Sequence, residues 1–138
     1  HELGEHRAGR WLEPGWAAMR LALQDRRTEL LVRAVRDHIA DFTHTLPTLL
    51  ADGSAASIHF WFAGFDGLRR QLFPSLLDAY QAWCAGDGGR ALQVHTGRGA
   101  LHFTRLAEQV LALHAQHAAA AETHIEALLS SSQAVCRG

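Results

Sequence analysis

Histidine is the residue type with the greatest chemical potential in this sequence, since ten of the 138 residues are histidine. Imidazole is the commonest metal ligand among side chains and titrates near neutral pH. His114 and His117 are three residues apart, so on a helix their Cβ atoms would lie about 5–6 Å apart and both rings could reach one metal ion. On one continuous helix His124 would lie about 10 Å from His117, a spacing that suits a larger ligand. The alternative is an alanine-rich helix that packs tightly, with its histidines at the margins.

A second group of candidate ligands lies earlier in the chain. His38, Asp41 and His44 follow one another at three-residue steps, which places the carboxylate beside each imidazole on one helix face. Such a carboxylate can share a metal with the imidazoles or fix their tautomer by hydrogen bonding. A solvated helix edge is the competing interpretation.

Four of these candidates come from separate segments: Asp41, His44, His95 and His117. The set resembles the metal site in the helical ligand-binding domains of GntR-type regulators, where an Asp and three His hold a metal under a small carboxylate effector. The spacing from Asp41 to His44 is one residue shorter than in that family, so the resemblance concerns the type of site. It implies a metal-dependent sensor.

Two arginine and histidine pairs suggest a different chemistry. Arg33 and His38, and likewise Arg90 and His95, are separated by four residues. This spacing resembles the motif of HEPN ribonucleases, which are helical bundles, although alanine stands where that family usually has a polar residue after the arginine. An arginine can stabilise phosphate charge while a histidine transfers a proton. The resemblance implies RNA cleavage as an alternative function.

The segment around residues 59–65 is bulky and apolar on every side. It contains the candidate pocket or interface residues His59, Trp61, Phe62 and Phe65. An axial histidine beside aromatic side chains would suit a haem. The same aromatic residues would also serve as ordinary core.

Composition limits the classes of partner. The net charge is −1, and all 13 basic residues are arginines scattered along the chain, so we expect no nucleic-acid partner. Cys84 and Cys136 form no CxxC motif, which argues against a disulfide framework and favours the cytoplasm. The longest strongly apolar stretch, 54–65, is too short to span a bilayer, so no membrane partner is expected.

Helical periodicity dominates the chain, and the alternating, β-branched segments typical of strands are absent. We therefore predict an all-α fold, a single-domain antiparallel bundle of about five or six helices with a long C-terminal helix. The expected helices cover residues 14–24, 28–46, 54–72, 74–85 and 100–129, with glycine-rich breaks at 86–89 and 96–99. A heptad seam through Phe103, Val110, His117 and His124 would run along the last of them.

The predicted organisation is a flexible segment at 1–10, a helical domain at 11–130 and a tail at 131–138. The leading functional hypothesis is a cytoplasmic sensory or regulatory domain that binds a small ligand, with a histidine-held metal or haem as possible cofactors, and that forms a homodimer. A dimerisation module without a ligand is the main alternative, and the HEPN-like ribonuclease is the second. The sequence leaves enzyme activity open and favours a domain that is not an enzyme.

Overall fold

The computed structural model describes residues 14–135, with side chains described for 14–132. Over this range the regular elements are α2 (Gly15–Ala22), α3 (Arg26–Ala40), η1 (Asp41–Thr45), α4 (Leu46–Asp52), α5 (Ala55–Ala63), α6 (Gly67–Leu72), α7 (Ser75–Cys84), α8 (Arg90–His117), η2 (Ala118–Ala120) and α9 (Ala121–Val135). All of them are helical, so the predicted all-α bundle is confirmed. The predicted flexible segment at 1–10 and the last part of the tail, 136–138, lie outside the described residues.

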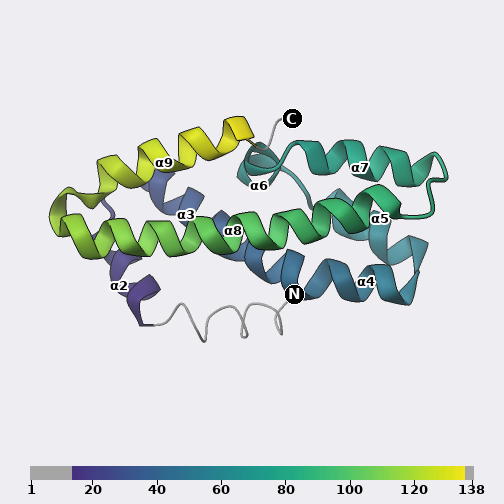
Figure 1. Cartoon of the computed structure of the whole chain (residues 1–138), viewed down its shortest axis with the longest axis horizontal. Helices are drawn as coiled ribbons and strands as arrows, with labels where there is room; N and C mark the ends of the chain where they lie inside the picture. Colours follow the sequence, from purple (N-terminus) through teal and green to yellow (C-terminus); the bar gives the residue numbers. More distant parts are fainter. Residues whose placement is uncertain (1–13, 136–138) are drawn as a thin grey trace.

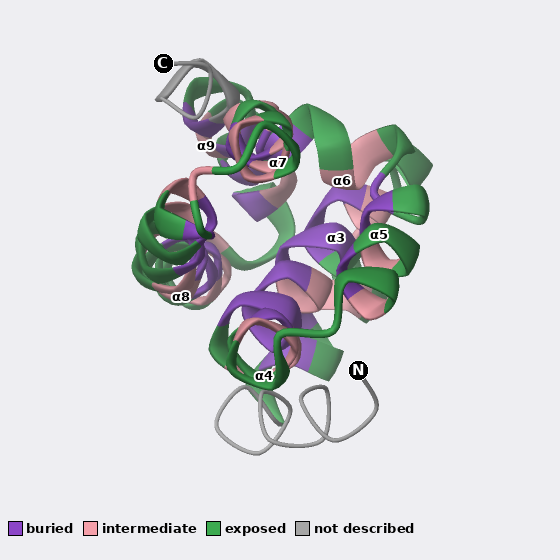
Figure 2. Ribbon diagram, turned by 90° about the vertical axis from the view of Figure 1, so that its right-hand side faces the viewer, coloured by how far each residue is buried: buried purple, intermediate pink, exposed green. Residues whose placement is uncertain are grey.

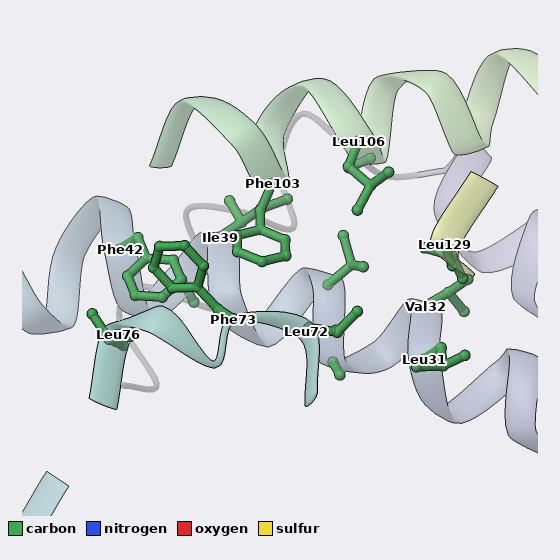
Figure 3. Close-up of a cluster of buried hydrophobic side chains, with 14 of the residues drawn as sticks. Leu31, Val32, Ile39, Phe42, Leu72, Phe73, Leu76, Phe103, Leu106 and Leu129 are labelled. Atoms are coloured by element: carbon green, nitrogen blue, oxygen red, sulfur yellow. The ribbon is translucent and has the colours of Figure 1, made fainter. Parts of the chain in front are cut away.

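The longest helix, α8, runs the length of the molecule, and α9 folds back along it (Figure 1). Helix α8 also packs on α3, whose ribbon is largely buried, whereas α5 lies at the surface (Figure 2). Between α8 and α3 the rings of Phe42, Phe73 and Phe103 pack with centroids 5.3–5.8 Å apart, and aliphatic side chains continue the core along both helices (Figure 3). Among residues 14–135 no helix combines the length and apolarity needed to cross a bilayer.

The second predicted helix does not end before Pro47, because the chain continues through a π-helical turn. The Leu46 N–H donates to the carbonyl of Asp41, five residues earlier. Proline has no N–H and its ring clashes with the carbonyl four residues before it, so a widened turn lets the helix pass the proline. The Thr43 hydroxyl donates to the Ile39 carbonyl at 2.6 Å and satisfies an acceptor at the start of this turn. The elements α3, η1 and α4 therefore form one continuous helical segment from Arg26 to Asp52.

The predicted break at residues 96–99 is wrong, since α8 begins at Arg90 and runs through it. Gly99 faces Phe42 so closely that a Cβ atom there would lie 2.8 Å from Phe42 Cδ2. A glycine at this position therefore permits the approach of two helices. Its neighbour Gly97 has no such contact within 4 Å.

The predicted helix over 54–72 is divided into α5 and α6. Backbone bonds from Gly64 N–H to the Trp61 carbonyl and from Phe65 N–H to the Phe62 carbonyl close a tight turn after α5. Gly67 then begins α6 with a φ of +52°, a value that glycine adopts at little cost. The apolar residues of the predicted stripe are therefore divided between two helices joined by a tight turn.

The long C-terminal helix also has different limits from those predicted: α8 ends at His117 and the chain reverses through η2 into α9. Ala118, at φ +47°, is the single non-glycine residue of the described range with a positive φ. Alanine propensity favours a continuous helix here, so tertiary contacts must impose the reversal. Ile125 and Leu129 are fully buried, and the Glu122 carboxylate accepts backbone N–H bonds from the start of α3. The heptad seam therefore does not continue past His117.

Candidate functional site

An open groove lies against α4 and α5 and has a volume of about 900 Å³. Most of its wall is apolar, and Thr45, Ser57 and Arg69 supply the polar groups. This volume is within the range of pockets that bind small molecules. We call it the α4–α5 groove; its lining residues are Thr45, Leu49, Ala56, Ser57, Phe60, Trp61, Ala63, Gly64 and Arg69.

Arg69, at the start of α6, is fixed by the side chain of Asp41. Its Nη2 atom donates to Asp41 Oδ2, and its guanidinium carbon lies 5.4 Å from the centroid of the Trp61 ring. The Trp61 indole N–H points to the other Asp41 oxygen at 3.4 Å. Asp41 is fully buried, while a quarter of the Arg69 side chain is exposed. The carboxylate thus anchors a guanidinium that still reaches the groove.

The backbone of Arg69 is fixed as well, by His38. The His38 Nε2 atom lies 2.8 Å from the Arg69 carbonyl oxygen, so Nε2 carries the proton and donates it to that carbonyl. His38 and Asp41 are three residues apart at the junction of α3 and η1. Two of the three candidate ligands predicted on this helix, His38 and Asp41, therefore converge on an arginine.

His38 is enclosed by aromatic rings. Its ring centroid lies 5.0 Å from that of Phe42, 4.6 Å from that of Phe103 and 6.1 Å from that of Phe65. Burial lowers the pKa of His38 from 6.5 to about 3, and the hydrogen bond to Arg69 opposes this shift only in part. The Nδ1 atom has no hydrogen-bond partner among the described residues. His38 is therefore a neutral, structural imidazole at neutral pH.

Opposing effects act on the pKa of the Asp41 carboxyl group. Burial raises the pKa of its carboxyl group above 3.8, whereas the charge of Arg69 and the hydrogen bonds from Trp61 and Arg69 lower it. The π-helical turn that begins at Asp41 is a feature often found at functional sites. A buried carboxylate, a fixed guanidinium and a helix irregularity thus occur together beneath the groove.

The remaining predicted ligands lie apart from this cluster. His95 makes a bond from Nδ1 to the Ala91 carbonyl at 2.9 Å, and His44 lies in the π-helical turn. His117 and His124 stack on one another with centroids 3.8 Å apart, contrary to the separation predicted for a continuous helix. His114 lies one turn earlier on α8. No group of three or more His, Cys, Asp or Glu side chains within the described part of the chain could hold a metal ion.

The four predicted pocket residues divide between two sides of α5. Trp61 lines the groove, whereas Phe62 and Phe65 are buried in the core. His59 turns toward α7, where its Nδ1 atom lies 2.6 Å from the Tyr80 hydroxyl. Arg69 was not predicted from the sequence, where the available signal was the pair of adjacent arginines at 69–70. Phe60 belonged to the apolar segment but was not named among the pocket residues.

The arginine and histidine pairs that resemble HEPN motifs differ in their surroundings. Arg33 is exposed and paired with Glu29 at 2.7 Å, while His38 is buried, so these two side chains share no surface. Arg90 and His95 both line a pocket of about 440 Å³. A shared surface is thus available only for the second pair.

A family model described as "Family of unknown function (DUF6866) C-terminal domain" matches residues 1–132. No curated protein and no solved structure matches the chain significantly.

Proposed function

The chain belongs to the family of unknown function DUF6866, in its C-terminal domain, and we propose that it is a sensory or regulatory domain that binds a small organic acid in the α4–α5 groove. The ligand would have an apolar body and one anionic group. The observation that carries the proposal is an arginine, fixed at both its backbone and its side chain by buried groups, on the wall of an apolar groove.

The apolar part of the ligand would rest on Phe60, Trp61 and Leu49. Phe60 is 83% exposed, although full burial of such a side chain is worth roughly 1.5–3 kcal/mol. The Trp61 ring is held by its indole bond to Asp41 and by Arg69 over its face. A flat or branched hydrophobic group in the groove would therefore cover apolar surface that the chain itself leaves open.

The anionic part of the ligand would contact Arg69. A guanidinium has five N–H donors and can serve two acceptors at once. Arg69 Nε and Thr45 Oγ1 are buried polar atoms of the groove residues that have no hydrogen-bond partner among the described residues. Both atoms lie beneath the surface, so a carboxylate would contact the exposed part of the Arg69 guanidinium beside them. This polar end needs neither a metal nor a haem.

A regulatory role follows from what Arg69 contacts inside the protein. Its carbonyl and its guanidinium bind two residues of the α3–η1 junction. A ligand that moves the guanidinium would therefore act on the π-helical turn of the central helix. The proposal includes a cytoplasmic location, since the exposed Cys84 thiol is kept reduced there.

Two fluorescent probes test the proposal directly. 1-Anilinonaphthalene-8-sulfonate has an aromatic body and a sulfonate, and N-phenyl-1-naphthylamine has the same body without the charge. We expect both to bind, with the sulfonate bound at least about tenfold more tightly, a difference of about 1.4 kcal/mol. Arg69→Lys should remove most of that difference, since lysine lacks the planar fork of donors. Equal affinities for the two probes in the unmodified protein would contradict an anion site.

A matched pair of variants locates the binding. Ala56 lines the groove, whereas its neighbour Ala55 is exposed outside it. Ala56→Phe should fill the groove and weaken both probes about tenfold or more, and Ala55→Phe should leave both unchanged. If the two variants behave alike, the probes bind elsewhere and the groove is not the site.

A second candidate function, self-association, is favoured by an apolar stripe on α8. Val94 and Leu101 are 53% and 62% exposed, and Gly97 lies between them on the same face with open space above it. A small residue at the centre of a helix face lets an identical helix cross closely, and a two-fold dimer would bring the same face of both chains together. Light scattering after size exclusion should show a dimer that Leu101→Glu converts to a monomer. A monomer at every concentration would eliminate this candidate.

A further inference from the structure

A serine and a histidine form a hydrogen-bonded pair between α8 and α9, on a part of the surface outside the α4–α5 groove. The His102 Nε2 atom lies 2.7 Å from the Ser132 Oγ atom, although the two residues are 30 positions apart in the sequence. Ser132 is 6% exposed, and His102 is partly buried. The pair therefore depends on the way that α9 folds back along α8 (Figure 1).

The neighbouring serine shows that this contact is particular to Ser132. The Ser131 hydroxyl donates to the Ala127 carbonyl, four residues earlier in α9, at 3.0 Å, which is a common partner for a serine within a helix. The Ser132 hydroxyl instead reaches an imidazole on another helix. A hydroxyl and an imidazole separated by about 2.6–3.2 Å have the geometry in which a base can activate a nucleophile.

The imidazole of His102 is suited to the role of that base. Burial lowers the pKa of His102 below its ordinary value, so the ring is neutral at neutral pH and one of its nitrogens has a free lone pair. With the ring proton on Nδ1, the Nε2 atom accepts the hydrogen bond from the Ser132 hydroxyl and can take its proton in a reaction. The Phe103 ring meets the imidazole edge to face, with centroids 4.8 Å apart, and helps to fix its orientation.

The pair lines a pocket of about 260 Å³ whose walls come from α8 and α9. Arg105 and Gln109 follow His102 by three and seven residues, so they lie on the same face of α8, and both line this pocket. Their side chains supply N–H donors, the kind of group that stabilises a negatively charged oxygen in acyl transfer. Leu106 and Leu128 supply apolar wall. The pocket is smaller than most sites for drug-sized ligands, which favours a small acyl group.

We propose that Ser132 and His102 are a catalytic pair that hydrolyses a carboxylic ester with a small acyl group. The Ser132 oxygen attacks the carbonyl carbon while its proton passes to His102 Nε2, and the carbonyl oxygen becomes an oxyanion near Arg105 and Gln109. Collapse of this intermediate breaks the carbon–oxygen bond to the alcohol, which leaves with the proton from His102. Water then attacks the acyl-serine with His102 as the base, and the products are an acid and an alcohol. This site is independent of the ligand proposed for the α4–α5 groove.

Labelling with methanesulfonyl fluoride tests the proposal before the natural ester is known. The reagent sulfonylates a serine that a neighbouring base activates, and fluoride leaves. We expect one sulfonyl group per chain, which peptide mass spectrometry should locate on Ser132. His102→Gln should slow the labelling about 100-fold or more, whereas Ser131→Ala, a matched change in the same pocket, should react at the unmodified rate. The absence of label on Ser132 in the unmodified protein would overturn the proposal, and this result does not depend on how any variant folds.

Hydrolysis of p-nitrophenyl acetate provides a second readout. Free imidazoles also cleave this ester slowly, so the rate that belongs to the site is the difference between the unmodified protein and Ser132→Ala. We expect a clear difference, which should disappear when the unmodified protein has been labelled with methanesulfonyl fluoride. Circular dichroism checks that Ser132→Ala is folded. Equal rates for the unmodified protein and its labelled form would show that Ser132 is not a catalytic residue and would also overturn the proposal.

Discussion

Two pairs of side chains, both conspicuous in the sequence, have opposite roles in the structure. His38 and Asp41, at the α3–η1 junction, are fully buried and both bind Arg69. His117 and His124, at the α8–α9 hairpin, lie at the surface and stack on each other. The first pair is part of the core, and the second pair makes a ring contact at the surface. The chemistry of a residue type therefore depends on its burial and its partners more than on its spacing.

The buried pair also bears on the ligand site proposed for the α4–α5 groove. The buried pair acts indirectly, because it positions a guanidinium that the groove exposes. His117 and His124 do not position another side chain in this way within the described part of the chain. Substitutions should therefore destabilise the protein strongly at the buried pair and hardly at all at the exposed one.

The largest effect is expected from Arg69→Met. This change removes the guanidinium that pairs with the buried Asp41 carboxylate, and the loss of one partner of a buried ion pair costs about 3–5 kcal/mol. Urea unfolding should show that reduction in the free energy of unfolding. Asp41→Leu combined with Arg69→Met removes both charges and should recover much of the loss. A single variant within about 1 kcal/mol of the unmodified protein would contradict the role given to Asp41.

The second effect is a pH dependence that belongs to His38. The pKa of His38 falls from 6.5 to about 3 on folding, so between these values the unfolded chain binds a proton that the folded chain does not. The free energy of unfolding should therefore decrease as pH falls through this window, by about 2–3 kcal/mol between pH 7 and pH 4.5.

The variant His38→Gln should lack this contribution, which is measured as the difference between two unfolding series. Asp41 acts with the opposite sign, since a raised pKa favours the folded state as pH falls. Because Asp41 is present in both proteins, its contribution should largely cancel when the two free energies of unfolding are subtracted. Identical pH profiles for the two proteins would show that His38 is not held neutral by burial.

The third effect compares two glycines of α8. Gly99→Ala places a methyl group 2.8 Å from the Phe42 ring and should reduce the free energy of unfolding by about 1–3 kcal/mol through overpacking. Gly97→Ala adds the same methyl in open space and should raise it by about 0.5–1 kcal/mol, because alanine favours helix. Thermal unfolding distinguishes the two. A loss of stability in both would mean that α8 lies differently on α3.

The smallest effect concerns the exposed pair. His117→Gln and His124→Gln remove one surface ring contact and should each change the free energy of unfolding by less than about 0.5 kcal/mol. His38→Gln, which opens an unsatisfied carbonyl and a gap among aromatic rings, is the reference for a large effect. A loss of several kcal/mol at His117 or His124 would remove the contrast between the two regions.

The sequence was sufficient for the fold class, since the apolar spacings of α2 and α3 correspond to buried helix faces. It was insufficient where tertiary contacts override local preference. Nothing in the alanines at 118–121 marks a reversal, because the Glu122 bonds that accompany it reach residues 97 and 98 positions away. A prediction from helix propensity alone therefore placed the end of the helix at Leu129, whereas α8 ends at His117.

The candidate site was likewise predictable only where it depends on local spacing along the chain. Three-residue spacing on a helix is a local property, so the sequence indicated that His38, Asp41 and His44 share one face, although it suggested metal ligands there. The partner of His38 and Asp41 was not visible, since Arg69 follows 28 residues after Asp41 and beyond two turns. The π-helical turn was also missed because Pro47 normally ends a helix and here only widens it.

The measurement that tests the central claim most directly is a nuclear magnetic resonance titration with 1-anilinonaphthalene-8-sulfonate. The account predicts shifts confined to the α4–α5 groove, with the side-chain Nε–H signal of Arg69 and the backbone amides of Thr45 and Phe60 among the most affected. The imidazole signals of His117 and His124 should not move. Shifts that cluster on α7 or α8 and leave the Arg69 signal in place would contradict the groove as the ligand site.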